Sequence, residues 1–129
     1  PEDDWARVHF LGQMPHAHFV GLLQLSTVHV YLTYPFVLGW SLLEAMSAGC
    51  AIVASNTQPV LEAIVHGDTG RLVDFFDITG LANEICDLLS NPGERTRLGA
   101  RARAFAQEHY DLQKVCLPRQ MQWVQELAA

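Results

Sequence analysis

One glutamate, Glu44, lies in an otherwise apolar segment of the chain. Its neighbours Leu43, Ala45 and Met46 are apolar, and a carboxylate among such side chains needs a hydrogen-bonding partner. A ligand with two adjacent hydroxyls, such as a ribose, presents a matched pair of donors to one carboxylate. The alternative is a partly exposed carboxylate that the helix dipole favours near a helix N-terminus. Spacing alone favours this second interpretation.

A loop containing proline and glycine, residues 34–41, precedes this glutamate. Pro35 fixes the backbone as the chain leaves a strand, and Gly39 allows close approach of the backbone to a ligand. The N–H groups of residues 38–42 would be the unpaired donors of a helix N-terminus, which suit a phosphate or sugar oxygen. An ordinary strand-to-helix turn would use the same residues, so the local sequence leaves both interpretations open.

The apolar pattern around this loop predicts a parallel βαβ unit. Residues 28–34 and 51–54 form near-continuous apolar strands, as expected when helices cover both faces of a sheet. Residues 40–48 form a short helix between them that ends at Gly49. In open α/β sheets, ligands bind outside the carboxyl ends of the strands, which is where residues 34–41 fall.

The rest of the chain continues the alternation of strands and helices. Further strands are expected at residues 8–11 and 70–73, and helices at 16–25, 59–65, 78–88, 92–109 and 118–128. Asp77 and Asn91 are the expected N-caps, and Met121, Val124 and Ala128 are expected to face inward. The pattern predicts an α/β fold, with a Rossmann-like parallel sheet of about four strands, flanking helices and a helical C-terminal tail.

Composition limits the class of protein. A chain of 129 residues with 50% hydrophobic content is enough for one domain. A net charge of −6 with 8 Lys+Arg argues against nucleic acid or an anionic membrane as partner. Three cysteines without a C-x-x-C motif predict free buried thiols in a reducing compartment. No apolar run reaches about 18 residues and no leader pattern is visible, so we expect a cytoplasmic protein without a membrane span.

The other candidate residues give no sign of a metal site or of a catalytic motif. His16 and His18 lie two positions apart on a predicted helix and do not face each other, so no metal site is expected. Trp5, Trp40 and Trp123 are expected to pack, with Trp40 close enough to the loop to shape it. No nucleophile elbow, G-x-G-x-x-G or Walker A motif is present. Dinucleotide-dependent oxidoreductases and P-loop ATPases are therefore not favoured, and no catalytic residue is assigned.

The segment YPFVLGWSLLEAMSAGCAIVAS at residues 34–55, followed by PVLEAIVHGDTGRLV at 59–73, resembles the donor-binding core of family 4 retaining glycosyltransferases of the GT-B fold. The resemblance implies that Glu44 hydrogen-bonds the ribose hydroxyls of a nucleotide-sugar. It implies that the backbone of Leu38, Gly39 and Trp40 approaches the sugar and diphosphate, and that Leu43 lies near the base or ribose. The nucleotide-sugar is a substrate, and neither a cofactor nor a metal is expected.

The same resemblance implies that the chain, residues 1–129, is a partial nucleotide-sugar-binding domain of a hexosyltransferase. Such an enzyme moves a sugar from its donor to an acceptor with retention, and its N-terminal domain, absent from this chain, binds the acceptor. The chain alone is therefore expected to be inactive. The donor sugar, the base and the acceptor are not determined by the sequence.

Two departures from the family pattern concern the site. Many members carry two glutamates with seven residues between them, and Phe36 stands at the first of these positions. This removes the usual acidic contact to the donor sugar. No Lys or Arg occurs between Arg7 and Arg71, so the chain is not expected to supply the positive charge that neutralises the donor diphosphate.

A third departure concerns the sheet. In the strand order 3-2-1-4-5-6 of this fold, residues 8–11 would be the third strand and residues 28–34 the fourth. Without the first two strands they are not neighbours, and each leaves an unpaired edge. We expect residues 8–11 to be poorly held, to slide against residues 28–34, or to pair with another copy, which would give self-association.

Two other functional classes remain open. One is an isomerase of the nucleotide-sugar epimerase type, which shares the fold; the L-L-E-A-M-S-A-G run at residues 42–49 fits the transferases better. The other is a non-catalytic α/β module that binds a nucleotide or a partner protein.

Overall fold

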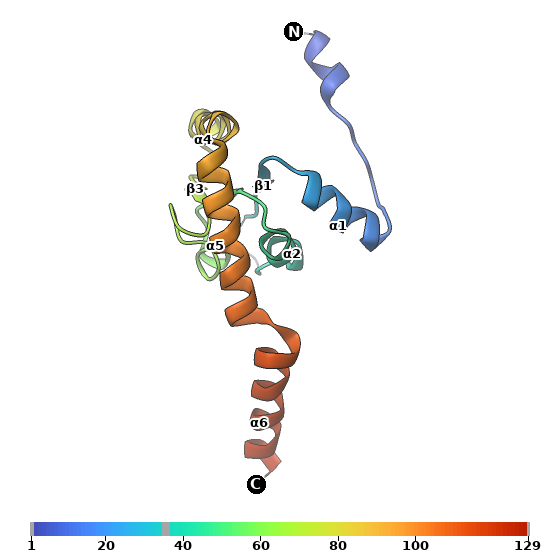
Figure 1. Cartoon of the computed structure of the whole chain (residues 1–129), viewed down its shortest axis with the longest axis vertical. Coiled ribbons are helices and arrows are strands. Elements are labelled where there is room, and N and C mark those ends of the chain that lie inside the picture. The colour runs from blue at the N-terminus through green and yellow to red at the C-terminus, as the bar shows by residue number, and fades with distance from the viewer. Residues whose placement is uncertain (1, 35–36, 129) are drawn as a thin grey trace.

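The structure, a computed structural model, describes residues 2–34 and 37–128. Its centre is a parallel sheet of three strands in the order β1–β2–β3 (Figure 1). β1 spans His29–Tyr31, β2 spans Ile52–Ser55 and β3 spans Arg71–Val73. Every residue of β2 is buried, as expected for a central strand covered on both faces. The α/β class with a parallel sheet is confirmed, with three strands in the described residues rather than about four.

Helices cover both faces of this sheet. Their bounds are His16–Leu25 for α1, Trp40–Ala48 for α2, Gln58–Leu61 for α3, Ile78–Ser90 for α4 and Pro92–Tyr110 for α5. One part of the core joins α1, α2 and α5 around Ile52, and the other joins α4 and α5 around Val53. The long helix α5 contributes to both parts and lies across α2 (Figure 1), so it fixes the helix that follows the loop.

Two helix starts follow the expected capping chemistry. The Asp77 carboxylate accepts the Gly80 N–H at 2.8 Å, and the Asn91 side chain accepts the Glu94 N–H at 3.1 Å. Each side chain satisfies a backbone donor that the first helical turn leaves unpaired. The Glu94 carboxylate binds Arg71 and Arg97, so it joins β3 to α5.

The N-terminal segment differs from the expected strand. After a 3-10 helix at Glu2–Arg7, residues 8–11 form no ladder with any described strand. They run along the outside of the molecule towards α1 (Figure 1), and Phe10 is 88% exposed. An extended segment needs a neighbouring strand to satisfy its backbone. In the described part of the chain, β1 pairs with β2 along one edge only, and residues 8–11 do not take up its other edge.

The C-terminal tail also differs from expectation. A π-helical turn at Leu112–Cys116 joins α5 to α6, Leu117–Ala128, which projects away from the sheet (Figure 1). Met121 and Val124, expected to face inward, are 55% and 61% exposed, and Ala128 is exposed too. The apolar spacing correctly predicted a helix, but no described element covers its apolar face.

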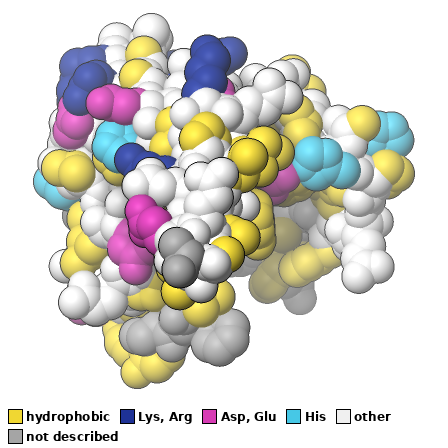
Figure 2. Space-filling view, turned by 90° about the horizontal axis from the view of Figure 1, so that it is seen from below, with side chains coloured by type: hydrophobic (Ala, Val, Ile, Leu, Met, Phe, Trp, Pro, Cys, Tyr) yellow, Lys and Arg dark blue, Asp and Glu magenta, His cyan; other side chains and the backbone are white. Residues whose placement is uncertain are grey.

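Several large apolar side chains lie at the surface. Trp5, Trp40 and Trp123, expected to pack, are 68%, 84% and 64% exposed. Figure 2 shows apolar side chains over the face seen from below, with Lys, Arg, Asp and Glu side chains among them, most of these on the left of the view. Of the cysteines, Cys50 is buried as expected whereas Cys86 is exposed, and all three are free.

None of the helices built from the described residues is both long and apolar enough to cross a membrane.

Candidate functional site

Three of the residues predicted to form the site share one face of α2. Leu43 and Glu44 follow Trp40 by three and four positions, which brings all three to one side of the helix. All three keep solvent access, whereas the opposite face of the same helix, Leu42, Ala45 and Met46, is completely buried. The packing of α2 against the core therefore leaves the Trp40–Leu43–Glu44 face available to a ligand.

Gly39 is the N-cap of α2 and lies against the end of β1. Its φ of −81° and ψ of 142° are extended and suit any residue. Its N–H donates to the Tyr31 hydroxyl at 3.2 Å, and a Cβ at this position would lie 2.5 Å from that hydroxyl oxygen. The glycine is thus required by Tyr31, a contact that the sequence did not indicate. The Gly39 N–H already has a partner in the protein, and the expected approach of this backbone to a ligand stays a prediction.

The start of α2 remains suited to an anion. No described side chain caps this helix, and Leu42 N donates to Gly39 O at 3.1 Å. The N–H groups of Trp40 and Ser41 precede that first bond and are the donors a helix N-terminus leaves unpaired. Because α2 follows a parallel strand, these donors lie at the carboxyl edge of the sheet, where ligands of open α/β sheets bind.

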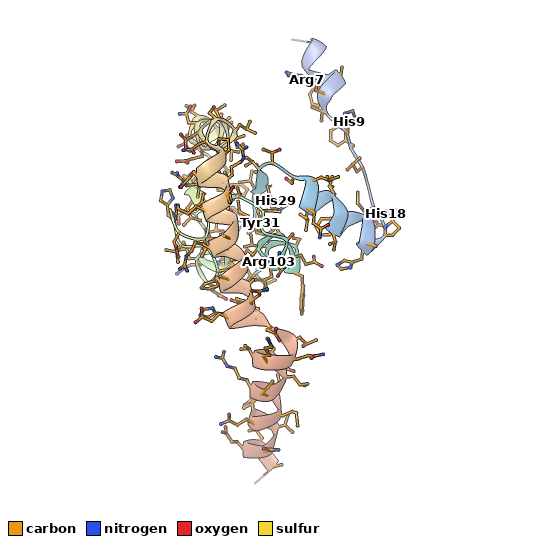
Figure 3. The ribbon with its side chains drawn as sticks, viewed as in Figure 1. Arg7, His9, His18, His29, Tyr31 and Arg103 are labelled. Carbon is orange, nitrogen blue, oxygen red and sulfur yellow. The ribbon has the colours of Figure 1, made fainter. Side chains whose placement is uncertain are left out.

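Glu44 has a partner that spacing did not predict. Its Oε1 lies 2.5 Å from the His16 Nε2 of α1. The two side chains are 34% and 72% exposed, respectively. His16 bonds Glu44, whereas His18, in the same first turn of α1, points outwards (Figure 3). In the described residues no group of three or more His, Cys, Asp or Glu could hold a metal ion.

A cavity of 430 Å³ lies beside the same face of α2. Its walls come from the loop and α2 on one side and from the end of α5 and the tail on the other: Leu38, Trp40, Leu43, Tyr110, Leu112, Cys116 and Gln120. Three of the five predicted site residues line it, and burial raises the pKa of Tyr110. The tail residues were not predicted, because nothing local in their sequence shows that they meet α2.

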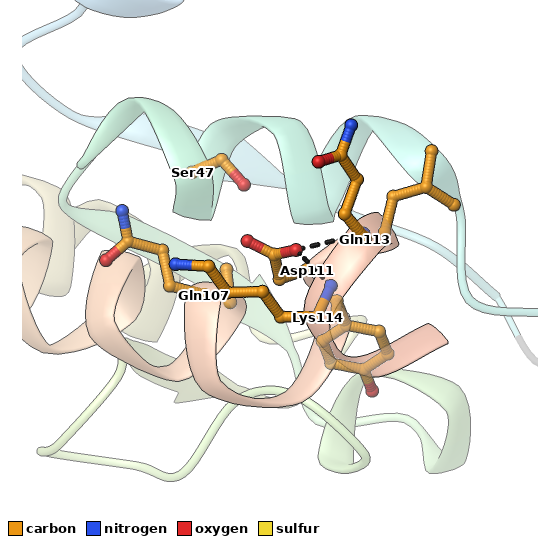
Figure 4. A pocket seen from close by; sticks show the side chains of 8 residues that line it. Ser47, Gln107, Asp111, Gln113 and Lys114 are labelled. Carbon is orange, nitrogen blue, oxygen red and sulfur yellow. Dashed lines mark hydrogen bonds between the residues drawn. The ribbon is translucent and has the colours of Figure 1, made fainter. Parts of the chain in front are cut away.

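A second cavity of 380 Å³ lies towards the other end of α2, next to Ser47 (Figure 4). The Asp111 carboxylate there accepts the backbone N–H groups of Gln113 and Lys114 at 3.0 and 2.8 Å, and so caps the π-helical turn. This cavity holds the chain's single lysine. The described lining of the 430 Å³ cavity includes neither Lys nor Arg. Phe36 lies outside the described residues.

Comparison with known proteins decides the family. A family model described as "Glycosyl transferases group 1" matches residues 4–105. The chain belongs to this glycosyltransferase family. Residues 34–55 and 59–73, on which the resemblance rested, lie inside the matched range.

Relatives with known names support this placement. The chain is 33% identical over 109 residues to N-acetyl-alpha-D-glucosaminyl L-malate synthase of Bacillus anthracis, a match that covers 84% of this chain and 28% of the relative. It is 35% identical over 107 residues to phosphatidyl-myo-inositol mannosyltransferase of Mycolicibacterium smegmatis, covering 79% of this chain and 26% of the relative. This glycosyltransferase chain therefore spans little more than a quarter of these relatives.

Solved structures share the fold. Sucrose-phosphate synthase from Thermosynechococcus elongatus superposes with a TM-score of 0.83 at 28% identity, covering 95% of this chain and 31% of that one. Anabaena HepE in complex with UDP-glucose gives a TM-score of 0.72 at 22% identity, covering 83% and 29%. The likeness to HepE shows the fold alone. The glycosyltransferase chain has the architecture of GT-B enzymes over nearly its whole length.

Proposed function

We propose that this chain forms part of the nucleotide-sugar site of a hexosyltransferase that transfers a sugar to an acceptor with retention. The observation that carries the proposal is the exposed Trp40–Leu43–Glu44 face of α2, which lies beside a 430 Å³ cavity at the carboxyl edge of the sheet. These are the positions at which the sequence resembles the donor-binding core. Residues 1–129 would then be a partial nucleotide-sugar-binding domain, inactive by itself.

Each residue has a role in this proposal. Glu44 accepts hydrogen bonds from the ribose hydroxyls, for which an ionised carboxylate has enough acceptor positions. Leu43 contacts the base or the ribose. The backbone of Leu38, Gly39 and Trp40 borders the sugar and diphosphate, where the first N–H groups of α2 and its dipole favour negative charge. No catalytic residue is assigned within the chain.

Relatives and neighbours support the choice of reaction. One named relative is an N-acetyl-alpha-D-glucosaminyl L-malate synthase and another is a phosphatidyl-myo-inositol mannosyltransferase. These names favour sugar transfer over the isomerase alternative. Structures with this fold are described in complex with UDP and with UDP-glucose. The acceptor would be bound by a part of the protein outside this chain, as would most of the positive charge for the diphosphate. No cofactor or metal is proposed.

Calorimetric titration with UDP, GDP and ADP tests the donor site. We expect one of these nucleotides to bind, and Glu44→Ala to weaken its binding about tenfold or more, because each hydrogen bond to a charged group contributes on the order of 1.5–3 kcal/mol. Glu108→Ala removes an exposed carboxylate on α5 and should leave affinity unchanged. Absence of binding at millimolar nucleotide, or binding that Glu44→Ala does not weaken, would contradict the proposal.

Retention is tested on the full-length enzyme. The anomeric configuration of the product, read by NMR, should equal that of the donor sugar. A product of opposite configuration would contradict retention while leaving the donor-site assignment intact.

A further inference from the structure

The carboxylate proposed to bind the ribose is already held by one protein group. An ionised carboxylate only accepts hydrogen bonds, so in the contact between His16 Nε2 and Glu44 Oε1, at 2.5 Å, the imidazole is the donor. Among the described residues, His16 is the one hydrogen-bonding partner of the Glu44 side chain. One carboxylate oxygen is therefore fixed, and the other has no protein donor in the described chain.

The topology of the sheet explains how His16 reaches this position. α1 ends shortly before β1 begins, and its first residue meets Glu44 of α2, the helix that starts at the carboxyl edge of the sheet. His16 is the first residue of α1, directly after Pro15 at the N-cap. The first residue of α1 and the second turn of α2 thus meet at the ligand edge of the sheet, although 28 positions separate His16 from Glu44.

The far end of α1 is firmly held. Leu23 is 3% exposed, and its carbonyl oxygen accepts a hydrogen bond from the buried Cys50 thiol, with 3.2 Å between sulfur and oxygen. Cys50 directly follows the glycine that ends α2. Leu23 also packs in the core that includes the buried face of α2, so the His16–Glu44 pair is not the only contact that places α1 beside α2. A side-chain contact as exposed as this one also adds little to the stability of the fold.

We propose that His16 is a positioning residue for the donor ribose. Its imidazole N–H holds Oε1 of Glu44, so that Oε2 and the remaining lone pairs face the two vicinal hydroxyls. Without it the carboxylate would rotate among its rotamers, and the matched pair of hydrogen bonds would form less often. This inference rests on the proposed function, because it assigns His16 a role only in recognising the ribose through Glu44.

Ribose discrimination is the measurement that separates positioning from a structural role. The affinity of the chain for UDP is compared with its affinity for 2′,3′-dideoxy-UDP by calorimetry, and the ratio reports the hydroxyl contacts alone. We expect His16→Ala to lower this ratio about three- to tenfold, the range expected for one hydrogen bond, and His16→Gln, which keeps a donor, to restore most of it. Affinity for the dideoxy nucleotide should stay within about twofold throughout.

Two further variants complete the design. His18→Ala removes an exposed histidine two residues along α1 and should not change the ratio. The double variant His16→Ala/Glu44→Ala should equal Glu44→Ala alone, because His16 has no role once the carboxylate is gone. Circular dichroism of each variant establishes that the fold is kept.

The outcomes distinguish the two proposals. If Glu44→Ala abolishes ribose discrimination and His16→Ala does not lower it, the positioning role is overturned and the donor-site proposal stands. If the unsubstituted chain binds UDP and its dideoxy analogue equally well, or binds neither, the ribose assignment of Glu44 fails, and the role of His16 fails with it.

Discussion

At the residue scale, the loop before α2 is shaped by one hydroxyl group. The Tyr31 hydroxyl accepts the Gly39 N–H and occupies the space that a side chain at position 39 would need. Tyr31 is only partly exposed and packs against the core of α1, α2 and α5, so it cannot move aside freely. The glycine and the tyrosine are therefore matched to each other, and together they set where α2 begins.

Gly39→Ala should destabilise the chain by about 1–2 kcal/mol, because the new methyl group overlaps the Tyr31 hydroxyl and the loop must shift. Adding Tyr31→Phe should recover most of this loss, since the ring carbon Cζ lies 3.6 Å from the Cβ position, an ordinary contact. Urea unfolding of the two single variants and the double variant measures the coupling. Purely additive effects would show that the overlap is not what makes Gly39 necessary.

At the element scale, the site depends on how closely α5 approaches α2. Gly99, buried on α5, lies against the backbone of Gly49, which ends α2 in the left-handed conformation with φ of 81°. A Cβ on Gly99 would overlap the Gly49 carbonyl oxygen. Neither backbone can yield as a flexible side chain would, so the contact of the two helices relies on this pair of glycines.

Gly99→Ala should lower the free energy of unfolding by about 3 kcal/mol, because the overpacking can be relieved only by separating α5 from α2. The same substitution at Gly21, inside α1 and with no neighbour within 4 Å of its Cβ position, should instead stabilise the chain by about 0.5–1 kcal/mol through helix propensity. Thermal and urea unfolding of both variants test this. Similar effects at the two positions would contradict the close-contact argument.

At the scale of the whole molecule, an ion-pair network joins β3, α4 and α5. The Arg71 guanidinium on β3 lies 3.5 Å from Glu84 of α4 and 2.9 Å from Glu94 of α5. Arg97 binds Glu94 as well, at 2.8 Å. The hydrogen bond from Arg97, followed by the charge of that group and the contacts of Arg71, lowers the pKa of Glu94 from 4.5 to about 2.

This network makes stability dependent on pH in the acid range. Since the pKa of Glu94 is lower in the folded chain than in the unfolded one, its contribution is present above pH 4.5 and is lost as pH falls towards 2. Glu94→Gln should therefore lower the melting temperature at pH 7. The difference in melting temperature between this variant and the original chain should shrink as the pH falls from 4.5 to about 2. Glu108→Gln, an exposed site on the same helix, should show no such trend. A difference that is constant from pH 7 to pH 2 would contradict the assignment.

Among the described residues, apolar side chains lie at the surface and both outer strands of the sheet pair along one edge only. In the described chain the outer edge of β1 has no strand beside it, and α6 exposes Leu117, Met121 and Val124. Unpaired edges with apolar neighbours favour pairing with other chains. Self-association through β1 stays a prediction of the sequence.

The sequence by itself determined the elements whose signals are local. The bounds of α1 and α2 were predicted to the residue, since apolar spacing and a glycine or proline at the ends act within a few positions of the chain. Asp77 and Asn91 were predicted as caps for the same reason. The face of α2 that carries Trp40, Leu43 and Glu44 also follows from helical spacing.

Only the tertiary structure decided which distant residues meet these elements. Within the described residues, no strand pairs with residues 8–11 although they have strand composition, and no element covers the apolar face of α6. The partners His16 for Glu44 and Tyr31 for Gly39, and the tail wall of the 430 Å³ cavity, all come from other elements. Periodicity records which face of an element is apolar, whereas the neighbour of that face depends on how the whole chain packs.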